Sequence, residues 1–154
     1  MFSNPFDEII FYLKRMIEVG VRPELQVFDT GHLASLEPLI DMGLLKPPYD
    51  VNLVMGVMGG MPASAAMLSF IVSQMPVGAI WKTTPISHLT WRMTALSLGS
   101  GGNVRVGLED NFYLPGGEMV KSNGDLVAHA AKIARAAGRT TATPDEARTL
   151  LGLA

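Results

Sequence analysis

The chain has 154 residues, a net charge of −2 and no cysteine, and only 17% of its residues are charged, against about 25% in ordinary globular domains. The lack of cysteine excludes disulfides and thiolate zinc sites, and the acidic balance without clustered basic residues argues against nucleic acid as a partner. No apolar run approaches the roughly 20 residues of a membrane span, and the first residues carry acidic side chains, so we expect a cytoplasmic protein without a signal peptide.

Helical and strand patterns alternate along the chain. Apolar residues at helical spacing, with Asn4 as a cap and Pro5 at the first helical position, predict the first helix, and short apolar runs bounded by glycine or aspartate predict buried strands. The expected helices are 5–19, 32–42, about 63–75, 86–98, 123–137 and 144–151, the last capped by Thr143. The expected strands are 24–28, 51–57, 78–82 and 104–108.

This alternation predicts an α/β fold with a parallel sheet and right-handed crossovers. A complete (β/α)₈ barrel needs about 250 residues and eight strands, whereas this chain offers about four βα units. Periodicity alone does not distinguish an open doubly wound sheet from part of a barrel.

In parallel sheets, functional groups gather where strands end. The segments that follow the four expected strands are 29–32, 56–62, 83–85 and 109–111. The last of these is the richest in charge, because Arg105 and Glu109 bracket the fourth strand and Asp110 follows it. Alternation predicts that Arg105 and Glu109 share one face of that strand. The group is interpreted either as a structural ion pair or as a site that binds a metal and an anionic substrate.

Other polar or flexible positions carry weaker signals. Gly59 and Gly60, after the second strand, could present backbone N–H groups to an anion, although a tight strand-to-helix turn explains them as well. The three histidines have no metal-binding spacing. We expect His129 on a helix surface, His88 near a helix start, and a structural role for His32.

Four segments, in this order, resemble the β-keto acid cleavage enzymes. They are RPELQVFDTG at 22–31, GLLKPP at 43–48, GVMGGMPA at 56–63 and VRVGLEDN at 104–111. The resemblance covers nearly the whole chain. It implies a zinc-dependent (β/α)₈ TIM barrel that condenses a β-keto acid with acetyl-CoA, giving acetoacetate and the CoA ester of the remaining acyl part.

The resemblance also implies residue roles. Glu109 matches a zinc ligand, while Arg105 and Asp110 match residues that hold the substrate and take part in catalysis. A catalytic glutamate is expected from the first strand, but Gln26 stands where the family usually has an acidic residue, so Glu24 is the fallback candidate. Gly59 and Gly60 are expected to contact the substrate.

The chain also departs from the family. Members are nearly twice as long, and the His-x-His zinc pair of their early strands is absent here. We therefore expect residues 1–154 to form one partial barrel domain, the C-terminal half of the fold, with weak zinc binding and no activity alone.

Three alternatives stay open. The chain could work with a complementing N-terminal half, or it could be a non-catalytic truncated half-barrel that self-associates as a homo-oligomer. Exposed sheet edges and an apolar inner face would drive either assembly. The third alternative is a small α/β domain that binds an anion through its glycine-rich loop.

Overall fold

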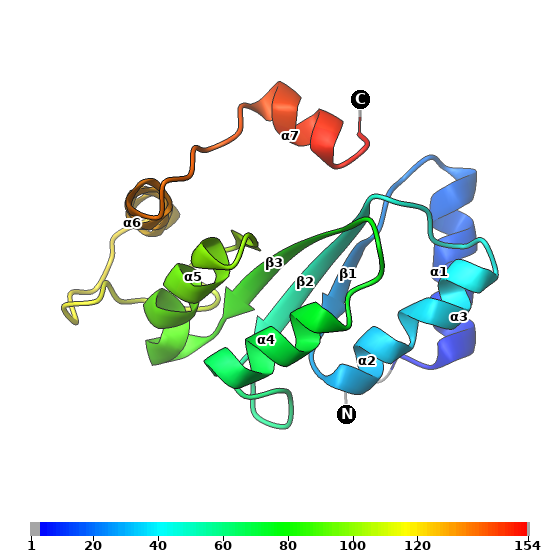
Figure 1. Ribbon diagram of the computed structural model, residues 1–154, viewed down its shortest axis with the longest axis horizontal. Helices are drawn as coiled ribbons and strands as arrows, with labels where there is room; N and C mark the ends of the chain where they lie inside the picture. Colours follow the sequence, from blue (N-terminus) through cyan, green and yellow to red (C-terminus); the bar gives the residue numbers. More distant parts are fainter. Residues whose placement is uncertain (1–3, 154) are drawn as a thin grey trace.

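A parallel four-stranded sheet, in the order β1-β2-β3-β4, organises the computed structural model, which describes residues 4–153 (Figure 1). The strands are β1 (Glu24–Val27), β2 (Tyr49–Met55), β3 (Ala79–Pro85) and β4 (Asn103–Val104). The predicted parallel sheet is confirmed.

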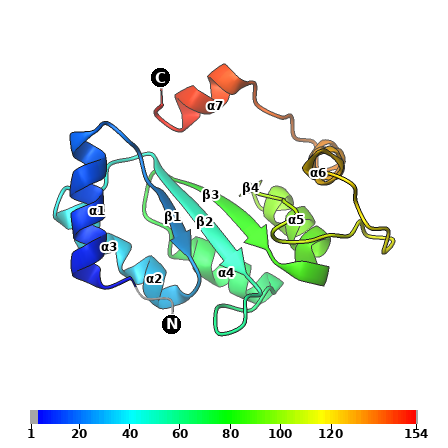
Figure 2. The ribbon, with the colours of Figure 1, turned by 180° about the vertical axis from the view of Figure 1, so that it is seen from behind.

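Helices alternate with the strands, and those between β1 and β4 cover one face of the sheet. The helices are α1 (Phe6–Glu18), α2 (Thr30–Ala34), α3 (Leu36–Asp41), α4 (Ala65–Ser73), the short 3₁₀ helix η1 (Ser87–Leu89), α5 (Thr90–Gly99), α6 (Asn123–Ala136) and α7 (Pro144–Leu150). Figure 2 shows the strands from behind, with no helix in front of them. No helix within residues 4–153 has the length and apolarity needed to cross a membrane.

The hydrophobic core lies between the sheet and its covering helices. Val27, Val51, Leu53 and Met55 point from the strands into this layer, where they meet buried helical residues such as Ile71. Each such side chain contributes about 1.5–3 kcal/mol through burial. The core therefore belongs to the outer, helix-covered face of the sheet.

The opposite face of the sheet, called the inner face below, is polar. Lys82 Nζ lies 2.5 Å from Asp50 Oδ1 and 2.8 Å from Glu24 Oε2. Asn52, fully buried, donates to Glu24 Oε1 at 3.0 Å and accepts from Thr84 Oγ1 at 2.7 Å. The predicted apolar inner face is therefore wrong, because strand alternation sends the apolar side chains to the helices and the polar ones to this side.

Two helix predictions need correction. Pro5 is the cap of α1 and lies outside it, so neither Asn4 as a cap nor Pro5 as the first helical residue is confirmed. The single helix expected over 32–42 is two helices, α2 and α3, that meet at Ser35. Pro38 explains the break, because proline has no N–H to donate to the carbonyl four residues earlier.

The third and fourth strands differ from prediction in opposite directions. β3 continues to Pro85 because it pairs with β2 along its whole length, so residues 83–85, expected in a loop, are strand residues. β4 ends at Val104, and only the amide of Arg105 extends its pairing, by donating to the Thr83 carbonyl at 2.9 Å.

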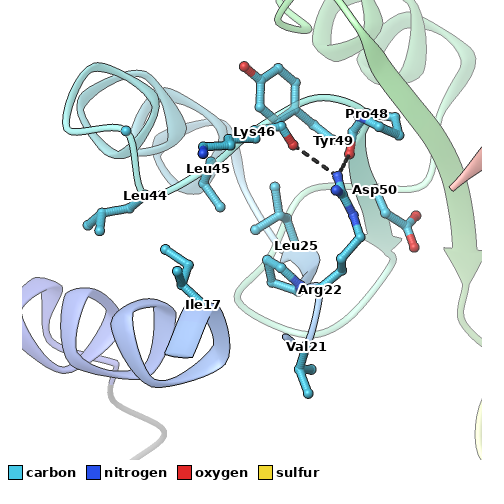
Figure 3. Close-up of a pocket in the computed structure, with 12 residues that line it drawn as sticks. Ile17, Val21, Arg22, Leu25, Leu44, Leu45, Lys46, Pro48, Tyr49 and Asp50 are labelled. Carbon is cyan, nitrogen blue, oxygen red and sulfur yellow. Dashed lines mark hydrogen bonds between the residues drawn. The ribbon is translucent and has the colours of Figure 1, made fainter. Parts of the chain in front are cut away.

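Arg22 fixes the loop that leads into β2, at the amino ends of the strands. Its guanidinium donates to the carbonyls of Lys46 at 3.0 Å and Pro48 at 2.8 Å (Figure 3). A cavity of about 180 Å³ lies beside it, with mostly apolar walls that include Ile17 and Leu25. The cavity is at the opposite end of the sheet from Arg105, and the arginine there satisfies backbone carbonyls.

Gly102 lies against the indole of Trp81 in the turn before β4. A Cβ added at Gly102 would overlap the Trp81 ring, whereas one added at Gly99 would meet nothing within 4 Å. We expect Gly102→Ala to lower the free energy of unfolding by about 2–3 kcal/mol through overpacking. Gly99→Ala, the matched control, is expected to leave it unchanged or raise it, as measured by urea denaturation.

Candidate functional site

A tight turn brings the predicted charged residues together at the carboxyl end of β4. The carbonyl of Gly107 accepts from the amides of both Asp110 and Asn111 at 3.0 Å, which reverses the chain. Arg105 and Glu109 therefore meet across a turn, and the prediction that they share a strand face is wrong.

Arg105 stands between two carboxylates. Its Nη2 lies 2.6 Å from Glu109 Oε2 and 3.6 Å from Asp110 Oδ2. The side chains differ in exposure: that of Glu109 is 81% exposed, that of Arg105 35%, and that of Asp110 only 6%. The guanidinium is thus anchored on one side, and it keeps further N–H donors available for an anion.

Asp110 is the buried member of this group. Its Oδ2 has no hydrogen-bond partner among residues 4–153. Burial raises the pKa of Asp110 above its ordinary 3.8, the Arg105 charge opposes this shift, and the Glu109 charge adds to it. A buried carboxyl group with a raised pKa and an oxygen that accepts no hydrogen bond is suited to hold or transfer a proton.

Two residues that the sequence analysis did not single out hold the turn in place. The Ser87 amide donates to the Asp110 carbonyl at 2.8 Å. Among the described residues, Ser87 is the one residue other than glycine that has a positive φ, of 64°. Asn123 Oδ1, at the start of α6, accepts from the Leu108 amide at 2.8 Å. Neither role carries a local sequence signal, because both contacts join segments that are distant in the chain.

The burial of Asp110 leads to a pH-dependent prediction. Because its folded pKa lies above its unfolded pKa, ionising it costs free energy as the pH rises past about 3.8. We expect Asp110→Asn to raise the free energy of unfolding by about 1 kcal/mol at pH 7, with the gain shrinking below pH 3.8. Denaturation curves at both pH values measure this, with Asp41→Asn, at an exposed aspartate, as the control. A gain that persists unchanged at low pH would contradict the assignment.

The other predicted site residues lie apart from this turn. Glu24 is at the amino end of β1, where Lys82 and Asn52 bind its carboxylate, although it lines the same cavity of about 530 Å³ as Arg105. Gly59 and Gly60 follow β2, where the Gly60 amide donates to the Val57 carbonyl at 3.0 Å. A Cβ at Gly60 would lie 2.8 Å from the Phe28 carbonyl oxygen, so this glycine allows a close approach of two loops.

The histidines take no part in this group. His32 accepts from the Phe28 amide at 3.3 Å and lies 3.5 Å from Asp29 Oδ2, a structural role as expected. His129, expected on a helix surface, is half-buried against Trp91, with ring centroids 4.5 Å apart, so that prediction is only partly right. Burial, and then the charge of Lys132, lower the pKa of His129.

The described residues alone do not fit a catalytic zinc ion. Within residues 4–153, no three histidine, aspartate or glutamate side chains lie close enough to hold a metal. Glu109, the residue that the resemblance implies as a ligand, is paired with Arg105. Catalytic zinc usually takes three protein ligands.

Comparisons with known proteins place this geometry in context. The model of the beta-keto acid cleavage enzyme family matches residues 1–153. The 3-keto-5-aminohexanoate cleavage enzymes of Fusobacterium nucleatum and Acetoanaerobium sticklandii are 39% and 38% identical, and each match covers 99% of this chain and 56% of the relative. The 3-dehydrocarnitine:acetyl-CoA trimethylamine transferase of Rhizobium meliloti is 34% identical over 91% of this chain and 46% of its own length. The chain spans about half the length of these curated relatives.

A solved structure shares the fold. The apo structure of ObcA superimposes with a TM-score of 0.82 at 18% identity, over 97% of this chain and 40% of that one. The parallel four-stranded sheet with helices on its outer face is half of a (β/α)₈ barrel, as the sequence predicts.

Proposed function

We propose, since this chain belongs to the β-keto acid cleavage enzyme family, that it supplies half of an active site that condenses a β-keto acid with acetyl-CoA. The products would be acetoacetate and the CoA ester of the remaining acyl group. The observation that carries the proposal is the placement of Arg105 beside the buried Asp110 oxygen, which accepts no hydrogen bond from the described residues, at the carboxyl end of β4. The name of the Rhizobium meliloti relative includes acetyl-CoA, which supports this substrate.

The residues of the turn have complementary roles in this proposal. The Arg105 guanidinium binds the carboxylate of the β-keto acid, with Glu109 holding its other side. Asp110 orients Arg105 and exchanges a proton with the substrate, because its carboxyl group is buried and its pKa is raised.

Three further residues have lesser roles. Glu24 is the second acid–base candidate, since it lines the cavity that Arg105 also lines. Gly59 and Gly60 let the substrate approach the backbone at the end of β2. The Gly60 amide is already used in its turn, which favours close approach over hydrogen bonding there.

Glu109 is proposed as a single zinc ligand, with the other ligands supplied from outside residues 4–153. Its 81% exposed carboxylate is accessible to such a site. This assignment is consistent with the absence of a three-ligand cluster within the described residues.

The proposed reaction is tested by assembling the chain with the portion of the Fusobacterium nucleatum relative that lies outside the match. The complex is given acetyl-CoA and a panel of β-keto acids, and acetoacetate is measured. We expect acetoacetate from the complex and none from the chain alone, because the chain holds half of the site. A well-formed complex that makes no acetoacetate from any β-keto acid would refute the proposal.

A further inference from the structure

The indole of Trp91, in the first turn of α5, contacts the segment that follows the charged turn at residues 105–111. Its Nε1 donates to the Tyr113 carbonyl at 2.7 Å. The same carbonyl accepts from Asn111 Nδ2 at 2.6 Å. A carbonyl oxygen has two lone pairs, so these two donors use both of them. The Tyr113 carbonyl therefore joins helix α5 to the residue that comes directly after Asp110.

Asn111 connects this contact to Asp110. It is only 6% exposed, and its Oδ1 accepts from the Tyr113 amide at 3.2 Å. Its own amide donates to the Gly107 carbonyl at 3.0 Å, and the Asp110 amide donates to the same carbonyl. Asn111 is thus held at its side chain and at its backbone. A displacement of Tyr113 would therefore reach Asp110 through Asn111.

The indole is itself held in place. Trp91 is half-buried, and its ring meets that of His129 on α6 edge to face, with centroids 4.5 Å apart and planes at 72°. α5 and α6 lie side by side in both views (Figures 1 and 2). The buried hydroxyl of Thr90 lies 2.9 Å from the Pro85 carbonyl oxygen and 2.7 Å from that of Ser87, which fixes the start of α5. A donor with a fixed position can hold its acceptor in place.

Arg105 and the body of α5 are anchored separately from this contact. The Arg105 amide donates to the Thr83 carbonyl at 2.9 Å, as an extension of the pairing of β4. Met93 of α5 is 1% exposed and packs in the hydrophobic core. Loss of the indole N–H should therefore loosen the Asp110 end of the turn, while the Arg105 end and the helix stay in place.

We propose that Trp91 is a positioning residue, which holds Asp110 beside Arg105. It acts from the outer helix layer, through the Tyr113 carbonyl and Asn111. The inference rests on the proposed function, in which Asp110 exchanges a proton and Arg105 binds the substrate carboxylate. A reacting group has to be held within about 0.5 Å of its productive position. Trp91 therefore affects the rate of the reaction more than the binding of the substrate.

Amide hydrogen exchange of the chain, followed by NMR, tests this positioning without any reaction. Trp91→Phe removes the indole N–H and keeps an aromatic ring against His129. We expect the amides of Asp110 and Asn111 to exchange about three- to tenfold faster, because a hydrogen bond that restrains the turn is lost. The amides of the buried strand β2 should exchange at the native rate. Arg92→Ala, which changes the exposed neighbour of Trp91 on α5, is the control and should leave both sets of amides unchanged.

Two results of this experiment would overturn the proposal. One is exchange of the Asp110 and Asn111 amides at the native rate in Trp91→Phe. The other is an equal acceleration in the turn and in β2, which would give Trp91 a role in overall stability only.

Kinetics provide a second measurement, in the complex of the chain with its partner, the portion of the Fusobacterium nucleatum relative outside the match. We expect Trp91→Phe to lower kcat about tenfold and to change KM by less than about twofold, because Asp110 loosens whereas Arg105 keeps its own anchor. An unchanged kcat, or a raised KM alone, would contradict the positioning role. If the native complex makes no acetoacetate, the proposed function fails, and the exchange rates still decide whether Trp91 holds the turn.

Discussion

Arg105→Ala, in the chain assembled with its partner, is expected to lower kcat/KM about 10²–10³-fold, with a higher KM and a lower kcat, while zinc is retained. The reason is that alanine removes the cation that would bind the substrate carboxylate and that stands beside Asp110. Glu109→Gln is expected to lose zinc. The measurements are steady-state kinetics, and zinc content by mass spectrometry of the purified complexes.

The matched control is Arg148→Ala on the exposed helix α7, which is expected to leave both activity and zinc unchanged. Arg105→Lys separates charge from shape, because a lysine ammonium cannot span two carboxylates as a guanidinium does. We expect it to restore only part of the loss. Equal zinc content in Arg105→Ala and Glu109→Gln would contradict the division of roles between the two residues.

Lys82→Met is expected to lower the free energy of unfolding by about 2–3 kcal/mol at pH 7, because it leaves Glu24 and Asp50 side by side without their cation. The Lys82 side chain is only 18% exposed, so water replaces it poorly. Urea denaturation measures the loss. Arg15→Met, which removes the exposed pair with Glu18, is the control and should change stability by less than about 0.5 kcal/mol.

The same ion group gives the expected loss a pH dependence. Burial alone would raise the pKa of Glu24, but the hydrogen bonds from Lys82 and Asn52 and the Lys82 charge outweigh it and lower the pKa below 4.5. A lowered pKa stabilises the fold above pH 4.5, and this stabilisation is lost as the pH falls through the folded value. The difference between Lys82→Met and the native chain should therefore shrink in acid. A difference that stays constant with pH would contradict the ion-group assignment.

The sequence predicts the order of the elements well, because that order depends on local patterns. The continuous apolar run that predicts β2, and the glycines Gly20 and Gly43 that follow expected helices, are signals carried by a few neighbouring residues. The resemblance to a known family adds the half-barrel. The break at Ser35 follows from a local rule about Pro38, and the sequence alone could have predicted it.

The polar inner face and the geometry of the site depend on contacts between distant segments. Asn52 sits inside an apolar run, and only the register with Glu24 and Thr84 reveals its partners. Arg105 was expected to share a strand face with Glu109, but the turn at Gly107 joins them instead. The burial of Asp110 likewise involves Ser87, which lies more than twenty residues earlier in the chain.

The C-terminal segment links the two edges of the sheet. Beside β4, Arg139 donates to the Gly102 carbonyl, and α7 follows. Gly152 then lies close to Arg22 and Pro48, near the start of β1 and β2: a Cβ added at Gly152 would lie 3.3 Å from Pro48 Cδ and 3.4 Å from the Arg22 guanidinium. The segment therefore connects the two edges of the curved sheet. Flattening the sheet would move these edges apart and break the contacts at one end of the segment, so the segment helps to preserve the barrel-like curvature of this half of the fold.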